Sequence, residues 1–323
     1  MRWGIIGCGD VTEVKSGPGF QKADHSELMA VMRRDGERAA DYARRHGVPR
    51  WYDKGDALIL DPEVDAVYVA TPPAPHKDYV LQCAAVGKPV YVEKPMAMNH
   101  AECLEMVEVC RRAGVPLFVA YYRRALARFV KIKEILDSGA IGTPRLVTVT
   151  LQRPASEADR DPAGNWRVDP AISGGGYFLD MASHMLDFLD YALGPIAKAQ
   201  GYAGNQAGLY KAEDIVAGSF VFESGVQGSG LWAFDAFGRM DETRIVGTRG
   251  SLTYATFDDS AVVLVTEAGR EEFVLPYPAH VHQPLIQTIV DELNGVGRCP
   301  STGESAARTT WVMDQLLGDY YTR

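Results

Sequence analysis

The chain contains little cysteine, and its few thiols follow no structural pattern. The five cysteines are an odd number, include no Cys-x-x-Cys pair and are scattered between Cys8 and Cys299. A disulfide framework and a thiolate zinc site are therefore both disfavoured, and a reducing cytoplasm is the expected compartment. No basic and apolar leader with a small-residue cleavage site follows Met1, so we expect no export signal.

Long apolar runs and blocks of one charge are also absent from the sequence. No stretch approaches the roughly 20 apolar residues that span a bilayer. The 33 Lys and Arg residues against 42 Asp and Glu residues give a formal net charge of -9, and the basic residues are spread along the chain. We therefore expect neither a membrane nor a nucleic acid as partner. With 323 residues, 46% of them hydrophobic, the chain is long enough for two globular domains.

Residues 1–121 alternate short apolar runs with amphipathic segments. Runs such as Trp3–Ile6 and Val90–Val92 are typical of buried strands, and helical periodicity covers Gly36–His46 and Asn99–Ala113. The alternation predicts an α/β domain in which crossover helices join the strands of a parallel sheet.

Residues 122–323 follow a different pattern. We expect a helix near Leu126–Asp137, and later segments such as Ile215–Phe222 have the β-branched character of strands joined by glycine-containing turns. This half is predicted to be a second α/β domain with a large, open, mostly antiparallel sheet. Two final helices are expected near Gln283–Leu293 and Gly303–Leu317.

The first predicted strand ends in a glycine turn, "IIGCGDVT". Gly7 and Gly9 allow a tight turn and a close approach of the backbone to a pyrophosphate, with a helix starting at Asp10 and Val11. Thr12 stands at the third glycine of the G-x-G-x-x-G pattern, so the motif alone is weak and a turn without a ligand is the alternative. Its place directly after the first strand favours a dinucleotide site.

The end of the second predicted strand indicates which nicotinamide dinucleotide binds. Arg33 and Arg34 follow "LMAVM", and Arg38 lies about one helical turn further on. Arginines at this corner accommodate a 2′-phosphate, so NADP is favoured. Asp35 is the competing residue, because a carboxylate there would accept hydrogen bonds from the ribose of NAD. The arginines could also form a solvated helix face, so NAD stays an alternative.

Two more strand ends carry unusual residues. In an open parallel sheet, ligands bind at the carboxyl ends of the strands. A lysine at the mouth of a buried strand is unexpected on structural grounds, because lysines are mostly solvated. Prolines, by contrast, also end strands for purely structural reasons, and a lone histidine is often a surface residue. The residues concerned are Thr71, Pro72, Pro73, His76, Glu93 and Lys94.

A glycine triplet and an Asp/His pair stand out in "GGGYFLDMASHMLDFLDYALG". Asp180 and His184 are four residues apart on a predicted helix and so share a face. A carboxylate that orients an imidazole is a useful general base near neutral pH, although the spacing alone is more often that of a structural pair. Asp187 and Asp190 are expected to face solvent.

Together these elements resemble one family. Over essentially its full length the chain is similar to the glucose–fructose oxidoreductase, inositol dehydrogenase and MocA family, and most to its NADP-dependent sugar reductases such as 1,5-anhydrofructose reductase. The elements that carry the resemblance are Gly7-x-Gly9, Thr71-Pro72-Pro73, Glu93-Lys94-Pro95, Tyr122-Arg123, Trp166-Arg167, Gly174-Gly175-Gly176 and Asp180-x-x-x-His184.

The resemblance implies a Rossmann domain over residues 1–121 and a substrate-binding and oligomerisation domain over 122–323. It also implies a homodimer or homotetramer formed through the second sheet, and a cis Lys94–Pro95 peptide. The expected reaction is hydride transfer between NAD(P) and a carbinol or carbonyl carbon of a sugar, an anhydro-sugar or a cyclitol. Substrate specificity is expected in loops such as Ala155–Asp169.

Roles for individual residues also follow from the resemblance. Lys94, Asp180 and His184 are the implied catalytic residues and touch the substrate, with His184 as the acid–base group. Lys94 either relays a proton or only polarises the reacting oxygen. The further implied binding residues are Tyr122 and Trp166 for the substrate, and His76, Glu93, Lys94, Arg123, Trp166 and Arg167 for the cofactor. Structural alternatives stay open: Glu93 could anchor its turn, Trp166 could fill a hydrophobic gap, and the arginines could pair with local aspartates.

Other functions also occur on this fold, biliverdin-reductase-like chemistry among them, and two are the main alternatives. One is a non-catalytic, dinucleotide-binding regulatory protein, which the presence of Lys94, Asp180 and His184 disfavours. The other is a glycosidase that recycles NAD. A metal site at His280 and His282 is disfavoured because no carboxylate or cysteine set adjoins them, and an exposed loop before a helix is expected there.

Overall fold

The computed structural model describes residues 1–161 and 163–321. The chain divides into two compact units, the first made of Met1–Leu126 and Pro278–Ala307, the second of Ala127–Tyr277 and the residues from Arg308 onward. The domain boundary expected at residue 121 stays a prediction. The return of residues 278–307 to the first unit was not anticipated, because periodicity does not reveal which core an amphipathic helix joins.

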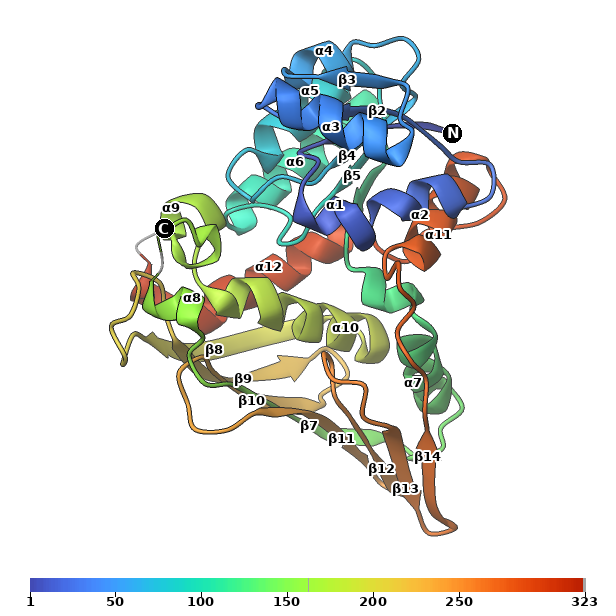
Figure 1. Cartoon of the computed structure of the whole chain (residues 1–323). Helices are drawn as coiled ribbons and strands as arrows, with labels where there is room; N and C mark the ends of the chain where they lie inside the picture. Colours follow the sequence, from blue (N-terminus) through green and yellow to red (C-terminus); the bar gives the residue numbers. More distant parts are fainter. Residues whose placement is uncertain (162, 322–323) are drawn as a thin grey trace. The chain divides into compact units, whose positions relative to one another are not determined.

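The first unit is built on a six-stranded parallel sheet with the order β3-β2-β1-β4-β5-β6 (Figure 1). This is the strand order of dinucleotide-binding Rossmann folds. Its strands are β1 (Arg2–Ile6), β2 (Glu27–Met32), β3 (Arg50–Tyr52), β4 (Ala66–Val69), β5 (Val90–Val92) and β6 (Leu117–Val119).

The helices of this unit include both helices predicted from periodicity. α3 ends at Gly47 with a φ of +66°, and the Asn99 side chain caps α6 by accepting the Glu102 N–H. The helices are α1 (Asp10–Val14), α2 (Gly17–Lys22), α3 (Gly36–His46), α4 (Gly55–Ile59), α5 (His76–Ala85), α6 (His100–Ala113) and α11 (Gln283–Leu293).

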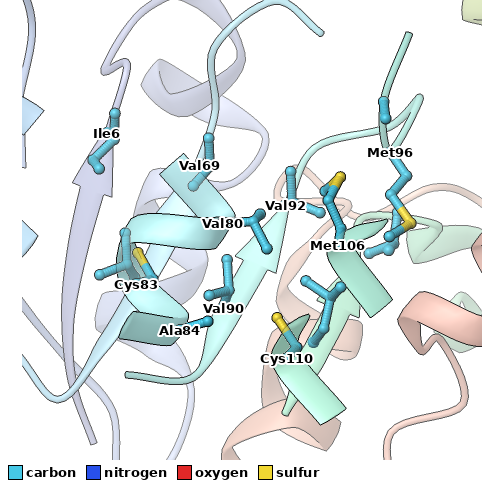
Figure 2. Packing of buried hydrophobic residues seen from close by; sticks show 14 of the residues in the cluster. Ile6, Val69, Val80, Cys83, Ala84, Val90, Val92, Met96, Met106 and Cys110 are labelled. Atoms are coloured by element: carbon cyan, nitrogen blue, oxygen red, sulfur yellow. The ribbon is translucent and has the colours of Figure 1, made fainter. Parts of the chain in front are cut away.

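Buried side chains form two clusters in the first unit. In the cluster of Figure 2, side chains of α5 and α6 pack against alternate positions of the strands, as expected for crossover helices on a sheet. Met96, which follows the predicted Glu-Lys-Pro turn, is fully buried in the same cluster. The turn is therefore anchored in the core on its carboxyl side.

The second unit is built on an eight-stranded sheet with the order β14-β13-β12-β11-β7-β10-β9-β8. Among the described strands of this sheet only the β7–β10 pair is parallel, so the prediction of an open, mostly antiparallel sheet is confirmed. The strands are β7 (Pro144–Gln152), β8 (Ile196–Gly204), β9 (Ile215–Phe222), β10 (Gln227–Ala233), β11 (Met240–Gly247), β12 (Gly250–Tyr254), β13 (Val262–Thr266) and β14 (Gly269–Phe273).

One face of this sheet is covered by helices, with α10 running along it (Figure 1). Phe220, Phe222 and Trp232 are buried on the covered face, whereas Leu231 is 40% exposed. No helix in the described part of the chain is both long and apolar enough to cross a bilayer. The helices are α7 (Ala127–Asp137), α8 (Glu157–Arg160), α9 (Pro170–Ser173), α10 (Ser183–Leu193) and α12 (Gly303–Leu317), the last of which starts in the first unit.

Candidate active site

The turn after β1 needs glycine at its first position. Gly7 has a φ of +92°, and a Cβ there would lie 2.8 Å from Cγ2 of Thr71 and 3.0 Å from its backbone nitrogen. Both the conformation and the close approach of the chain after β4 therefore exclude a side chain. The N–H groups of Gly7 and Cys8 donate to the Met32 carbonyl at 2.8 and 3.1 Å, which ties the turn to the end of β2.

The same turn leaves room and a hydroxyl for a bound dinucleotide. A Cβ on Gly9 would meet no atom closer than 3.8 Å. Thr71 Oγ1 is buried and has no hydrogen-bond partner among the residues the structure describes. The Thr12 hydroxyl accepts the Gly9 N–H at 2.9 Å and donates to the Gly9 carbonyl at 2.8 Å. Threonine thus closes the turn where a third glycine was expected, and the turn fits a pyrophosphate.

The corner after β2 brings one arginine onto this turn. Arg33 Nη1 donates to the Cys8 carbonyl at 3.3 Å, while Arg34 is exposed. Asp35, the residue that would favour NAD, is the N-cap of α3: it accepts the Arg38 N–H at 3.2 Å, and its other oxygen lies 3.3 Å from Arg38 Nε. The carboxylate is therefore engaged in capping a helix.

His76 links two of the predicted strand ends. It is fully buried, with Nε2 2.8 Å from the Thr71 carbonyl and Nδ1 3.1 and 3.2 Å from the Pro95 and Met96 carbonyls. Burial lowers the pKa of His76, against the opposing effect of these carbonyls. The ring braces the turn after β4 against the turn after β5. Its predicted contact with the cofactor stays a prediction.

The turn after β5 holds Lys94 next to a buried carboxylate. Glu93 is 7% exposed, and its Oε1 accepts a short hydrogen bond from the Tyr68 hydroxyl. Its Oε2 accepts the backbone N–H of Lys94 at 3.1 Å. Burial, followed by the charge of Glu93, raises the pKa of Tyr68 well above its ordinary value, so the phenol remains a donor. The Lys94–Pro95 peptide is cis, which confirms that expectation.

Tyr122 and Arg123 lie in the turn after β6 and contact each other. Arg123 Nη1 donates to the Tyr122 hydroxyl at 3.1 Å, and its guanidinium lies 5.1 Å from the centre of that ring. The ring centre of His282 also lies near Tyr122, at 4.3 Å from the centre of its ring. His282 is 1% exposed, so the prediction that it lies in an exposed loop was wrong.

In the second unit, the glycine triplet lets the chain at Ala212 and Glu213 pass close to the start of the helical segment that follows the triplet. A Cβ on Gly176 would lie 2.7 Å from the carbonyl oxygen of Glu213 and 2.9 Å from Cβ of Ala212. The buried Glu213 carboxylate accepts the Gly176 N–H at 2.9 Å. The chain that leads to the Asp/His pair is therefore fixed by a contact that only glycine permits.

The Asp/His pair does not lie on one regular α-helix. Asp180 belongs to a π-helical turn (Phe178–Ala182), and α10 follows from Ser183 with His184 in its first turn. Such π-helical insertions are rare and occur frequently at functional sites. His184 is 4% exposed, and its ring centre lies 6.1 Å from that of Phe257.

Trp166 and Arg167 approach Asp180 from a short 3-10 helix (Trp166–Val168). Arg167 Nε lies 3.4 Å from Asp180 Oδ2, and the guanidinium lies 4.5 Å from the centre of the Trp166 ring. The structure therefore brings three predicted site residues together within the second unit. Arg167 pairs with Asp180, which agrees with a purely structural role for this arginine. Binding roles for Trp166 and Arg167 therefore stay predictions.

A buried ion pair anchors the predicted specificity loop, of which residue 162 lies outside the described residues. Asp159 is fully buried and accepts hydrogen bonds from Arg153 Nη1 at 2.9 Å and from the Tyr177 hydroxyl. Burial alone would raise the pKa of Asp159, but the hydrogen bonds from Arg153, Tyr177 and Ser156 outweigh it and lower the pKa to about 2. The loop is thus tied to the chain beside the glycine triplet.

Several residues around the site were missed or misplaced by sequence reasoning. Asp187 and Asp190 were expected in solvent but are 1% and 2% exposed, and Arg308 forms a bidentate pair with Asp190. Tyr68 and Tyr91 had a readable signal: both are the central residue of a Val-Tyr-Val run before a predicted site turn, and they are neighbours in the sheet. His282 and Asp159 had none.

The chain matches known proteins over both halves. Residues 1–121 match the family described as "Oxidoreductase family, NAD-binding Rossmann fold", and residues 129–253 match the "GFO/IDH/MocA C-terminal domain". An oxidoreductase from Formosa agariphila is 39% identical over 320 residues, covering 98% of both chains. A 1,5-anhydro-D-fructose reductase from Ensifer adhaerens is 29% identical over 94% of this chain and 91% of its own.

The fold is shared with solved structures as well. An aldose-aldose oxidoreductase from Caulobacter crescentus, crystallised with glycerol, superposes with a TM-score of 0.87 at 23% identity, covering 98% of this chain and 96% of that one.

Proposed function

The chain belongs to the Gfo/Idh/MocA family of NAD(P)-dependent oxidoreductases, and on this basis we propose that it oxidises or reduces a carbinol or carbonyl carbon of a sugar, an anhydro-sugar or a cyclitol. The observation that carries the proposal is the turn after β5, where a buried Glu93 holds Lys94 at the carboxyl edge of the dinucleotide sheet. The similarity to a 1,5-anhydro-D-fructose reductase supports this class of substrate. The bound nicotinamide supplies or accepts the hydride.

The side chains of the protein handle the proton and the oxygen. His184 takes the hydroxyl proton during oxidation and returns it during reduction. Asp180 orients the imidazole and contacts the substrate. Lys94 donates hydrogen bonds to the reacting oxygen and stabilises developing alkoxide charge, with a place in a proton relay as the alternative role. Tyr122 and Trp166 are proposed further substrate contacts.

The test is a screen of sugars, anhydro-sugars and cyclitols with NADP(H) and NAD(H), followed at the nicotinamide absorbance. We expect a substrate-dependent change with at least one compound of these classes. A glycosidase that recycles NAD would release product with no net change in absorbance. A regulatory protein would bind the dinucleotide and turn over no compound.

We also propose that NADP is the preferred cofactor. Arg33 contacts the glycine turn, Arg34 is the exposed residue next to it in the chain, and the competing Asp35 is engaged with Arg38 as a helix cap. We expect Arg33→Ala/Arg34→Ala to weaken NADPH binding by roughly 10- to 100-fold, since a lost hydrogen bond to a charged group costs about 1.5–3 kcal/mol. NADH binding should change by less than about threefold, because NADH lacks the 2′-phosphate.

Isothermal titration of both cofactors measures this preference directly. Arg44→Ala is the matched control, since Arg44 is an exposed arginine of α3 that pairs only with Asp41 among the described residues. An unchanged ratio of NADPH to NADH affinity in the double variant would remove these arginines from cofactor selection.

We propose that the open face of the second sheet joins copies of this chain in a homodimer or homotetramer. Tyr202, Leu231 and Leu146 are 77%, 40% and 43% exposed. Tyr202 and Leu231 both pair with Ala217 across adjacent strands, so the two lie in one row. Exposed apolar faces of this kind are typical of interfaces between subunits.

Leu231→Glu is expected to shift the protein to monomers, because it places a charge in an apolar contact. Light scattering after size-exclusion chromatography measures the mass. Leu104→Glu, at a 51% exposed position on α6, is the matched control and should leave the mass unchanged. A parent that is monomeric at all concentrations would refute the proposal.

We further propose that the protein acts in the cytoplasm. All five of its cysteines lie in the described part of the chain, are buried and form no disulfide there, which fits a reducing compartment. Fractionation of the source cells should recover the chain with cytoplasmic enzymes, and its recovery from the periplasm or the medium would contradict the proposal.

A further inference from the structure

His282 enters the first unit from a part of the chain far from every motif in the sequence. It directly precedes α11, and its backbone N–H donates to the Lys15 carbonyl at 3.2 Å, while its own carbonyl accepts the Ile286 N–H at 2.9 Å. The side chain is 1% exposed and lies against the ring of Tyr122. Both the backbone and the ring of His282 are therefore fixed by their surroundings.

The ring nitrogens of His282 face one tyrosine and one carboxylate. Nδ1 is 3.1 Å from the Tyr91 hydroxyl, and Nε2 is 3.7 Å from Glu93 Oε1. Burial, followed by the positive charges of Lys15, Lys94 and Arg123, holds the pKa of His282 well below its usual value, so the ring is neutral and carries one N–H.

The position of that hydrogen follows from the neighbours. Nε2 faces the Glu93 carboxylate, which only accepts, so Nδ1 is the acceptor for the Tyr91 hydroxyl; burial and then the Glu93 charge keep this hydroxyl protonated by raising its pKa well above its ordinary value. The N–H is then at Nε2, directed at Glu93. At 3.7 Å this contact is longer than a hydrogen bond and acts as a dipole on a buried carboxylate.

Glu93 connects His282 to the backbone of Lys94. Its Oε1 is held by the Tyr68 hydroxyl and faces His282, and its Oε2 accepts the Lys94 N–H at 3.1 Å. A rotation of the carboxylate would therefore displace the backbone of Lys94 itself. The core packing of Met96 fixes the other side of the turn.

We propose that His282 is a positioning residue for the reaction proposed above: through Glu93 it fixes the turn that aims the Lys94 ammonium. The inference rests on the proposed function, since it assigns His282 a role only if Lys94 acts in turnover. His282 itself is buried behind the turn and needs no contact with the substrate. A displacement of about 1 Å at a catalytic group costs roughly 100-fold in rate, which sets the size of the expected effect.

Three substitutions separate positioning from simple packing. His282→Phe removes both polar contacts. His282→Asn keeps an acceptor near the place of Nδ1 for Tyr91 but loses the donor toward Glu93, whereas His282→Gln keeps an amide donor near the place of Nε2. We expect kcat to fall roughly 10- to 100-fold in the Phe and Asn variants and less than about fivefold in the Gln variant. The KM for substrate and the affinity for NADPH should change by less than about threefold in all three.

Thermal unfolding and a neighbouring variant provide the controls. His280→Gln, two residues away on a partly exposed loop, should keep parental kcat and KM. If the Phe variant does not fold, the ranking of Gln above Asn decides the question, since each keeps one polar group.

The proposal is overturned if the Asn variant matches the Gln variant in kcat, or if folded His282→Phe turns over at the parental rate while only its melting temperature falls. Lys94→Ala measured beside them identifies the source of a failure. Loss of turnover in Lys94→Ala with full turnover in His282→Phe refutes only the role of His282. Full turnover in Lys94→Ala refutes the catalytic role of Lys94 and, with it, that of His282, whereas a parent protein that turns over none of the screened compounds refutes the proposed function.

Discussion

Lys94→Ala is expected to lower kcat by roughly 10²- to 10³-fold, because it removes the donor that stabilises charge on the reacting oxygen. The backbone at Lys94 is held by the hydrogen bond from its own N–H to Glu93 and by the buried Met96 that follows. Neither of these supports depends on the ammonium. The variant should therefore fold with parental stability, and kcat should fall far more than the affinity for NADPH, to which the implied contact of Lys94 with the cofactor contributes.

Steady-state turnover on the substrate found by screening, with NADPH binding measured separately, checks this expectation. Lys54→Ala is the matched control, because Lys54 is an exposed lysine of the same unit. A Lys94→Ala variant that kept its kcat and raised only KM would show that the ammonium binds substrate equally in the ground and transition states. One that kept both parameters would remove Lys94 from the reaction.

His184→Ala is expected to lower kcat by roughly 10²- to 10⁴-fold, the range for loss of a general acid–base group. The imidazole is 4% exposed and packs edge-on to Phe257, so bulk water has little access to replace it as the proton acceptor. Asp180→Asn should cost less, because it removes the orienting charge and leaves the imidazole in place. Tyr191→Phe on the same helix is the control and should leave kcat unchanged.

The dependence of kcat on pH is a second measurement that tests the role of His184 in the His184→Ala variant. A general base produces an acidic limb in the pH profile of the parent. That limb should disappear in His184→Ala. A variant with parental kcat, or a low kcat with the parental profile intact, would assign the proton transfer to another group.

Strands could be predicted from the sequence where burial leaves a clear pattern of apolar residues, and they were missed where it does not. The runs at Val90–Val92 and Ile215–Phe222 are strands with the predicted bounds, because central strands carry β-branched, apolar residues. The missed strands are β3, β8 and β14. β3 has three residues, and in β14 most positions are exposed and charged, so neither shows the expected alternation.

The motifs of the candidate site could be predicted from the sequence, but the distant residues that hold them in place could not. The Glu-Lys-Pro turn and the Asp/His pair are local in sequence, so their spacing carries information. The carboxylate of Asp190 is buried because Arg308, 118 residues later, pairs with it, and His282 reaches Tyr91 across 191 residues. No periodicity encodes such contacts. The π-helical turn at Asp180 is likewise invisible to a pattern of α-helical spacing.

Hydride transfer itself is tested most directly with NADPH deuterated at C4 of the nicotinamide and the keto or aldehydo form of the substrate found by screening. With deuterium at both C4 positions of the nicotinamide, mass spectrometry should find one deuterium bound to the new carbinol carbon, and none at that carbon in the product formed with unlabelled NADPH in deuterated water. A product without deuterium at that carbon would contradict the assignment of the chain as a sugar or polyol oxidoreductase.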